Sequence, residues 1–300
     1  MSLENLAQIS NALEGIVDRA GGSVVRVEAR RRVPSSGVAW SEDVVAAANH
    51  AVEWDDEITV GLPDGETAVA DVTGRDSATD LAILKLRAGR LRPAAWSDVE
   101  GTKPGALAVA VSRPGRAVRA HLGAIAVRSG EWRSPAGGRL DAYLETTIPI
   151  RWGFSGSLLV AATGDAIGVN TSGLRRGTSL AVPGATVRRV VEGLLAHGRI
   201  RRGYLGIGTY PVRFPSDLAE KTGQRSGLLV VSIAPGGPAA KAGLVFGDVL
   251  VAFDGRPVSH AGELIQALDE ESVGKSATLR IVRAGELRDI AVEIGARDAA

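Results

Sequence analysis

The sequence DSATDLAILKL at residues 76–86 joins a polar turn to an apolar run long enough for one buried strand. Asp80 is the last polar residue before this run. A carboxylate at such a border carries a large desolvation penalty unless it is hydrogen-bonded. A histidine N–H would be a suitable partner, although a local backbone amide in the turn would also satisfy the carboxylate. The stretch therefore predicts a buried strand with a partnered carboxylate at its start.

One of the four histidines lies at the end of another short apolar run. His50 follows Asn49 directly after the sequence VVAAA at residues 44–48. A polar residue at the mouth of a buried strand is where a barrel would present a catalytic side chain. The other three histidines need no functional role: His121 lies in a β-rich stretch, His197 ends a helical pattern and His260 precedes one. His50 is therefore the candidate partner of Asp80.

A serine between glycines occurs in the sequence RWGFSGSLLV at residues 151–160. Such a turn exposes the Ser155 hydroxyl, and the N–H groups of Gly153 and Ser155 could hold the oxyanion of a tetrahedral intermediate. A serine hydroxyl is a weak nucleophile that needs a base, which a third group orients. His50, Asp80 and Ser155 supply these roles in the chain order of the chymotrypsin-type arrangement. The α/β-hydrolase order is different, and its elbow needs glycine where this chain has Ser157.

Short apolar runs separated by turns fill residues 23–182. The runs fall at residues 23–27, 44–48, 57–62, 81–86, 106–111, 124–127 and 166–170. Many short strands at close spacing indicate a sandwich or a barrel rather than a βαβ sheet. The 38 glycines and the low aromatic content of 4% agree with tight turns and a core of small aliphatic side chains. We therefore expect a mostly β fold in this region.

Two amphipathic helices frame the β-rich region. Apolar residues recur at helical spacing over residues 3–17, and again between Pro183 and Gly198. After Gly203 the pattern is strand, loop, strand, short helix, strand, helix and strand. We therefore divide the chain into an N-terminal helix at residues 1–22, a β-rich domain with a closing linker helix at residues 23–202, and an α+β domain at residues 203–300.

Composition excludes several classes of function. The absence of cysteine removes disulfides, thiol catalysis and thiolate zinc sites. A net charge of +1 gives no overall field toward nucleic acid or an anionic membrane. No aromatic residues interleave with the basic run at residues 30–32, so we interpret that run as a solvated loop rather than an anion-binding patch.

The cellular compartment depends on whether the sequence is complete. No apolar run reaches the roughly 20 residues that would span a bilayer. Residues 1–20 lack the basic start, apolar stretch and small-residue cleavage site of a signal peptide. We expect a cytoplasmic protein if the sequence is complete, and a periplasmic one if an N-terminal segment has been trimmed.

Six motifs together resemble the HtrA (DegP-like) family of trypsin-fold serine proteases. They are NHAV at residues 49–52, ATDLAILK at 78–85, FSG at 154–156, GVNT at 168–171, the helix at 183–202 and RGYLGI at 202–207. The resemblance implies two perpendicular six-stranded barrels with the triad in the cleft between them, followed by an α+β PDZ domain. It implies an endopeptidase that cleaves unfolded or misfolded proteins and uses no metal, ATP or other cofactor. It also implies a trimer, in which the helix at residues 3–17 either contacts another subunit or packs on its own barrel.

The resemblance assigns two sets of binding residues besides the triad. Asn170, Thr171 and Ser172 would line the substrate cleft. The loop that would receive a peptide C-terminal carboxylate consists of Tyr204, Leu205, Gly206 and Ile207, whose backbone N–H groups are suited to that role. A helix at residues 261–268 would wall the groove, with Leu264 and Leu268 either in its pocket or in the core.

The serine motif departs from the family pattern, which is Gly-Asn-Ser-Gly-Gly-Pro. Phe154 replaces a small polar residue, and Ser157 and Leu158 replace the Gly-Pro that lets the next strand pass beneath the cleft. These departures keep open a second interpretation. In it the chain is a weak or inactive protease-fold scaffold that binds protein C-termini through its PDZ domain.

Overall fold

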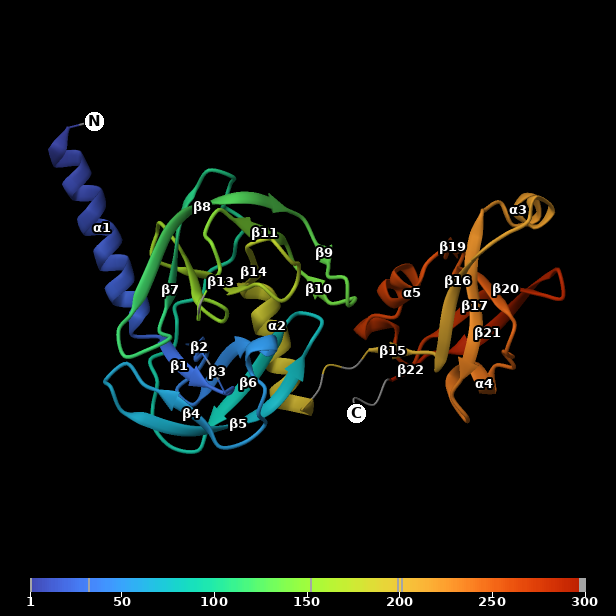
Figure 1. The fold of residues 1–300 in the computed structure, drawn as a ribbon, viewed down its shortest axis with the longest axis horizontal. Helices are drawn as coiled ribbons and strands as arrows, with labels where there is room; N and C mark the ends of the chain where they lie inside the picture. The colour runs from blue at the N-terminus through green and yellow to red at the C-terminus, as the bar shows by residue number, and fades with distance from the viewer. Residues whose placement is uncertain (1, 32, 152, 199, 201, 297–300) are drawn as a thin grey trace. The chain divides into compact units, whose positions relative to one another are not determined.

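The computed structural model describes residues 2–31, 33–151, 153–198, 200 and 202–296. Some residues used in the predictions therefore lie outside the described residues, namely Arg32, Trp152, Arg199, Arg201 and residues 297–300. The chain forms two compact units, residues 1–200 and residues 201–300 (Figure 1). Each unit has its own hydrophobic core.

The first unit begins with a closed six-stranded barrel. Its strands follow the order β1 (Val24–Glu28), β2 (Ser35–Ala39), β3 (Val44–Ala48), β6 (Leu81–Leu86), β5 (Thr67–Asp76) and β4 (Ile58–Gly61). Strand β3 is buried on both faces: Val45 and Ala47 fill the barrel, while Val44 and Ala46 pack in the neighbouring core. Burial on both faces explains why this strand is a continuous apolar run instead of an alternating pattern.

A second closed barrel completes the unit. Its strands follow the order β11 (Tyr143–Thr146), β14 (Leu180–Pro183), β13 (Ala166–Thr171), β12 (Leu158–Ala161), β7 (Leu107–Ser112) and β8 (Arg119–Ser129). A small hairpin, β9 (Trp132–Arg133) with β10 (Arg139–Leu140), extends from it. One apolar cluster joins strands of both barrels to the two long helices, so the barrels pack as one body.

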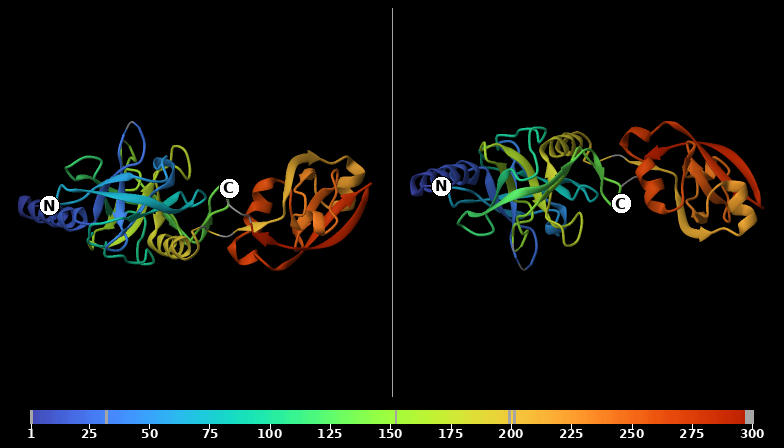
Figure 2. Two further views of the ribbon diagram at one scale, coloured as in Figure 1. Left: turned by 90° about the horizontal axis from the view of Figure 1, so that it is seen from below. Right: turned by 90° about the horizontal axis from the view of Figure 1, so that it is seen from above.

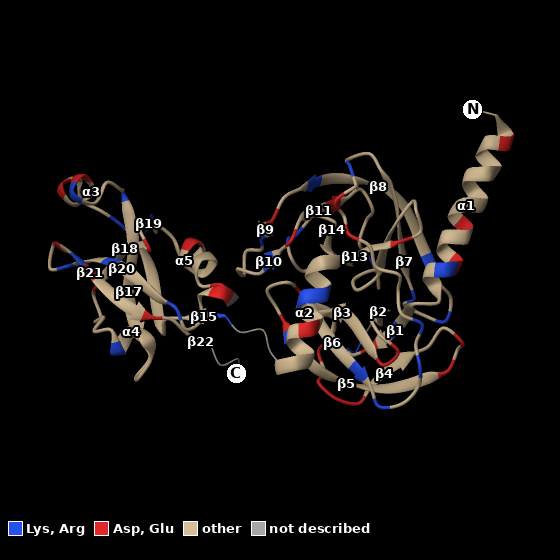
Figure 3. Cartoon of the chain, turned by 180° about the vertical axis from the view of Figure 1, so that it is seen from behind, with Lys and Arg blue, Asp and Glu red and all other residues tan. Residues whose placement is uncertain are grey.

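Helix α1 (Leu3–Gly21) packs on the barrels through its C-terminal half only. Ile16 is buried there, whereas Leu3 and Leu6 are exposed, Leu3 at 87%. Figure 2 shows the helix extending away from the barrels, and charged positions on it are few in Figure 3. In the sequence, Glu4 is the one charged residue among its first ten. The apolar residues in the C-terminal half of α1 are therefore explained by packing on the chain's own barrels. A contact of the other half with another subunit stays a prediction.

Helix α2 (Gly184–His197) buries a stripe formed by Val187, Val190, Val191 and Leu194. It ends at Gly198, whose φ of 69° lies in the left-handed region that favours glycine. Leu195, which the periodicity placed on the same face, is exposed instead. The stripe is thus narrower than the sequence pattern indicated.

The second unit is an α+β fold built on one antiparallel sheet. Its strands follow the order β16 (Ile207–Arg213), β17 (Ser226–Ile233), β18 (Val249–Phe253), β20 (Ser276–Arg283) and β21 (Glu286–Glu293), with β19 (Arg256–Pro257) beside β18 and a separate pair, β15 (Gly203–Tyr204) with β22 (Gly295–Ala296). Its helices are α3 (Ser216–Thr222), α4 (Pro238–Lys241) and α5 (Ala261–Ala267), with short 3-10 turns at Glu270–Ser272 here and Asn49–Ala51 in the first unit. The predicted fold class, two barrels followed by an α+β unit, is confirmed.

A buried ion pair fixes the turn before β18. The Asp248 carboxylate is fully buried and accepts hydrogen bonds from the Arg283 guanidinium at 2.7 Å and from the Val245 N–H at 2.9 Å. Burial alone would raise the pKa of the Asp248 carboxyl, but these donors hold its pKa below the usual range. Asp248 is therefore ionised in the folded protein.

Candidate active site

His50 and Asp80 form the best-defined contact of the site. The His50 side chain follows β3, and its Nδ1 lies 2.7 Å from Asp80 Oδ2. The His50 backbone N–H donates to Asp80 Oδ1 at 2.9 Å. Asn49, the preceding residue, is held by Arg75, whose Nη1 donates to Asn49 Oδ1 at 3.0 Å. The histidine partner expected for the Asp80 carboxylate is thus present.

The backbone of Asp80 has an unusual conformation. Its φ of 57° lies in the left-handed region, which aspartate enters more readily than most residues. The turn before it is held by Asp76, which accepts from the Thr79 hydroxyl at 2.6 Å and the Ala78 N–H at 3.2 Å. The Thr171 hydroxyl also donates to Asp80 Oδ2. The Asp80 carboxylate is 5% exposed, and its orientation is therefore fixed from several sides.

Ser155 lies in a tight turn before β12 that the first barrel supports. The Ser36 hydroxyl, on β2, donates to the Gly153 carbonyl at 2.9 Å, and the Ser36 N–H donates to the Ser155 carbonyl at 3.3 Å. Gly153 and Gly156 have φ of 85° and 81°. A Cβ at Gly156 would also collide with the Ser36 carbonyl, so both the conformation and the close approach require glycine there.

Two backbone N–H groups beside Ser155 are free to bind an anion. Within the described residues, the N–H groups of Gly153 and Ser155 have no hydrogen-bond acceptor. The flanking N–H groups, in contrast, are used: Phe154 donates to the Arg151 carbonyl and Gly156 to the Asn170 carbonyl. The two free groups are the pair that the sequence predicted for an oxyanion.

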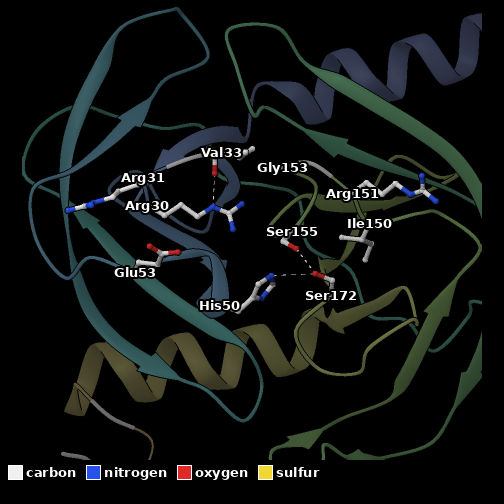
Figure 4. Close-up of a pocket in the computed structure, with 10 residues that line it drawn as sticks. All are labelled: Arg30, Arg31, Val33, His50, Glu53, Ile150, Arg151, Gly153, Ser155 and Ser172. Atoms are coloured by element: carbon white, nitrogen blue, oxygen red, sulfur yellow. Dashed lines mark hydrogen bonds between the residues drawn. The ribbon is translucent and has the colours of Figure 1, made fainter.

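The hydroxyl of Ser172 lies between Ser155 and His50. Ser172 Oγ is 3.1 Å from Ser155 Oγ and 3.4 Å from His50 Nε2, as the dashed lines in Figure 4 show. In the described parts of the chain, Ser155 and His50 share no direct hydrogen bond. Asn170 and Thr171, the other predicted cleft residues, are buried behind Ser155. Of the three, only Ser172 reaches the open pocket.

Gly173 is a site residue that sequence reasoning missed. A Cβ at this position would lie 2.5 Å from Asp80 Oδ2 and 2.6 Å from His50 Nδ1. Its N–H donates to the Thr171 hydroxyl at 2.9 Å, which is the same hydroxyl that bonds Asp80. The backbone therefore passes directly over the His50–Asp80 contact, which leaves no room for a side chain.

The pocket at this site has a volume of about 620 Å³. It is lined by Arg30, Arg31, Val33, His50, Glu53, Ile150, Arg151, Gly153, Ser155 and Ser172 (Figure 4). Two of these residues belong to the basic run that we interpreted as a solvated loop. The fold brings Arg30 and Arg31 into the same pocket as Ser155, which lies far away in the sequence.

Comparison with known proteins agrees with this geometry. Family models for a trypsin-like peptidase domain and a PDZ domain match residues 35–169 and 203–294. Proteins named probable periplasmic serine endoprotease DegP-like are similar, at 33% identity over 276 residues in Rhizobium meliloti and 33% over 273 residues in Halomonas elongata. The chain is HtrA/DegP-like. It spans about half the length of these curated relatives, 54% and 57%, while they cover 89% and 88% of this chain.

Solved protease structures match nearly the whole chain. The HtrA-type protease AlgW with a decapeptide aligns with a TM-score of 0.72 and 25% identity, covering 97% of this chain and 99% of that one. The serine endoprotease from Yersinia pestis aligns with a TM-score of 0.71 and 27% identity, covering 95% and 98%. Among the described residues, no helix has the length and apolar character to cross a membrane.

The residues that depart from the HtrA serine motif are accommodated behind the cleft. The Ser157 hydroxyl is fully buried and accepts from Asn170 Nδ2 at 3.0 Å. Leu158 begins β12 and packs in the core between the barrels. The Phe154 ring stacks on His121, with centroids 4.1 Å apart. None of these three side chains lines the pocket at Ser155.

The predicted carboxylate loop of the HtrA-type PDZ unit lies before the edge strand β16. The Leu205 and Gly206 carbonyls accept from Ala239 and Ala234, at 2.9 and 2.8 Å, whereas their N–H groups have no acceptor in the described part of the chain. Tyr204 lies in β15 and Ile207 begins β16. Leu264 is a core residue at 5% exposure, and Leu268, the residue after α5, is half-buried against the same core. The pocket role suggested for Leu264 therefore has no support in its burial.

Proposed function

We propose that this chain is a serine endopeptidase in which Ser155 attacks the scissile carbonyl. His50 takes the hydroxyl proton and delivers it to the leaving amine, and Asp80 holds the imidazole. Water then attacks the acyl-enzyme: His50 takes a proton from the water and returns one to Ser155 Oγ, which leaves as the carboxylic acid product is released. The observation that carries the proposal is the His50–Asp80 contact at 2.7 Å beside a glycine-flanked Ser155 in one pocket.

The proposed oxyanion site consists of the free N–H groups of Gly153 and Ser155. Donors that are already oriented before the reaction stabilise developing charge without further reorganisation. The inactive-scaffold interpretation rested on Ser157 and Leu158, and both pack away from the pocket. A fluorophosphonate probe tests the proposal: it should label the chain, and peptide mapping should place the label on Ser155. Absence of labelling at a folded site would argue for the scaffold.

Catalysis by this site needs the Ser155 hydroxyl to turn from Ser172 to His50. Ser172 Oγ occupies the hydrogen-bonding position of both groups in the resting arrangement. A typical hydrogen bond has a net worth of about 1 kcal/mol, so a competing bond of this kind holds back the productive contact by about that amount. Ser172 would therefore position the nucleophile in an idle state.

Replacing Ser172 by alanine is expected to raise kcat/KM about threefold to tenfold, because the competing hydrogen bond is lost. Steady-state hydrolysis of a short peptide by the wild type and the variant measures the change. Ser179→Ala, a serine outside the pocket, is the matched control. A tenfold decrease would mean instead that Ser172 relays the proton between Ser155 and His50.

We further propose that residues 203–300 form a PDZ domain that binds peptide C-termini and delivers unfolded proteins to the protease domain at residues 23–202. Strand β16 pairs with β17 on one side and is an edge of the sheet, and α5 lies against it. An extended peptide can add to such an edge as a further strand. The free N–H groups of Leu205 and Gly206 precede this edge, where the terminal carboxylate of that peptide would arrive. AlgW, a similar protein over nearly its whole length, has been solved with a decapeptide, which supports peptides as ligands of such chains.

Peptides that end in a free carboxylate are expected to bind about tenfold or more tightly than the same peptides with an amidated terminus. Hydrogen bonds to a charged group contribute roughly 1.5–3 kcal/mol, and 1.4 kcal/mol is a factor of ten. Calorimetry on the full chain with Ser155→Ala avoids cleavage during the measurement. Equal affinity for acid and amide would show that the loop before β16 does not capture a terminus.

A further inference from the structure

Three arginines surround Ser155 in the pocket. Arg30 and Arg31 follow β1 of the first barrel, and Arg151 lies in the loop before Ser155 in the second. In Figure 4 Arg30 and Arg31 lie on one side of the Ser155–His50 pair, and Arg151 lies on the other, beside Ile150. The Arg30 guanidinium points toward Ser155, whereas the side chains of Arg31 and Arg151 extend away from it at the two ends of the pocket (Figure 4). Arg30 is therefore the guanidinium that a substrate meets beside Ser155.

These charges are not neutralised by the protein. Within the described residues none of the three arginines forms an ion pair, and Glu53 is the one carboxylate that lines the pocket. The pocket lining therefore carries three arginines against one carboxylate, although the chain as a whole has a net charge of only +1. A concave site lined by one sign of charge concentrates its field and attracts ligands of the opposite sign.

Arg30 is held in place rather than free in solvent. Its Nε donates to the Val33 carbonyl at 2.6 Å and the residue is partly buried, which leaves the two terminal nitrogens for another acceptor. A guanidinium whose orientation is fixed loses less entropy when it pairs with a carboxylate.

We infer that this cleft selects peptide segments that carry aspartate or glutamate next to the scissile bond. The inference rests on the proposed endopeptidase function and specifies its substrate class. An extended peptide advances about 3.3 Å per residue, so a pocket that holds both Ser155 and the arginines reaches only the few residues on either side of that bond. Arg30 receives the acidic residue on the first-barrel side, and Arg31 and Arg151 add positive charge at the two ends of the pocket.

The test uses two internally quenched peptides that differ only in Asp and Glu against Asn and Gln at the positions flanking the cleaved bond. For the wild-type chain we expect kcat/KM to be about tenfold or more higher for the acidic peptide, and the ratio to fall as salt is added. Replacing Arg30, Arg31 and Arg151 together by glutamine should bring the ratio close to one, because the loss in kcat/KM falls mainly on the acidic peptide. Arg90→Gln, an exposed arginine outside the pocket, is the matched control.

Charge reversal gives the sharpest outcome. Arg30→Glu with Arg31→Glu should invert the preference toward peptides that carry lysine at the same positions. Equal cleavage of acidic and neutral peptides by the wild type would overturn the inference, as would equal losses on both peptides in the glutamine variant. If neither peptide is cleaved, the endopeptidase proposal fails by itself. Affinities of the Ser155→Ala chain for the same two peptides then decide the inference: preferred binding of the acidic one supports it, and equal binding overturns it.

Discussion

Replacing Ser155 by alanine is expected to lower the rate of casein hydrolysis by on the order of 10⁵ or more. The nucleophile, base and orienting carboxylate act as a unit, so removing the attacking atom removes the benefit of the other two. His50→Ala should have an effect of similar size. Asp80→Asn should reduce the rate by about 10⁴, because the amide would favour the wrong tautomer of His50.

The readout is release of soluble peptides from casein, with circular dichroism and thermal unfolding to verify the fold of each variant. Ser129→Ala, an exposed serine at the end of β8, controls for the loss of a hydroxyl as such. The variant at Ser155 should also lose its reaction with a fluorophosphonate. If wild type and Ser155→Ala digest casein equally fast, the endopeptidase assignment is wrong and the PDZ unit would carry the function.

The strands that flank the site could be predicted because their burial shows in the sequence. Residues 44–48 and 81–86 are apolar with the single exception of Lys85, and β3 and β6 have these bounds in the structure. Strand β2 (Ser35–Ala39) was missed because its Ser-Ser-Gly start is typical of a turn. Its polar atoms are needed inside the fold, where Ser36 bonds the turn that holds Ser155. Such a role exists only once the two barrels are packed together.

Long-range proximity explains what else the sequence did not reveal. Nothing in the sequence around Arg30 and Arg31 indicates that they border the pocket, because their position depends on closure of the first barrel around β1 and β2. In the second unit, helix α3 (Ser216–Thr222) buries no residue and therefore leaves no amphipathic signal. Leu264 has the periodicity of a core residue and of a groove residue alike, and only its burial separates the two roles.

Replacing Gly173 by alanine should reduce kcat by on the order of 10³, with little effect on folding. The added methyl group would lie 2.5 Å from Asp80 Oδ2 and 2.6 Å from His50 Nδ1, so the two side chains must separate. Gly173 does not have a positive φ, so alanine brings no backbone strain. A misplacement of about 1 Å in a catalytic group reduces the rate about 10²-fold, and loss of the carboxylate's orienting role about 10⁴-fold. The expected value lies between these limits.

A double variant of Gly173 and Asp80 tests whether the loss in kcat comes from the His50–Asp80 contact. If the new methyl group acts by separating His50 from Asp80, then adding Asp80→Asn to Gly173→Ala should lower kcat little beyond the slower of the two single variants, because both changes remove one interaction. Gly130→Ala, at a glycine with open space around its Cβ position and no positive φ, should leave kcat unchanged. Fully multiplicative losses in the double variant would show that residue 173 affects the rate through another contact. A normal rate in Gly173→Ala would mean that the His50–Asp80 contact tolerates the displacement, and the carboxylate would then orient the imidazole less strictly than the 2.7 Å contact indicates.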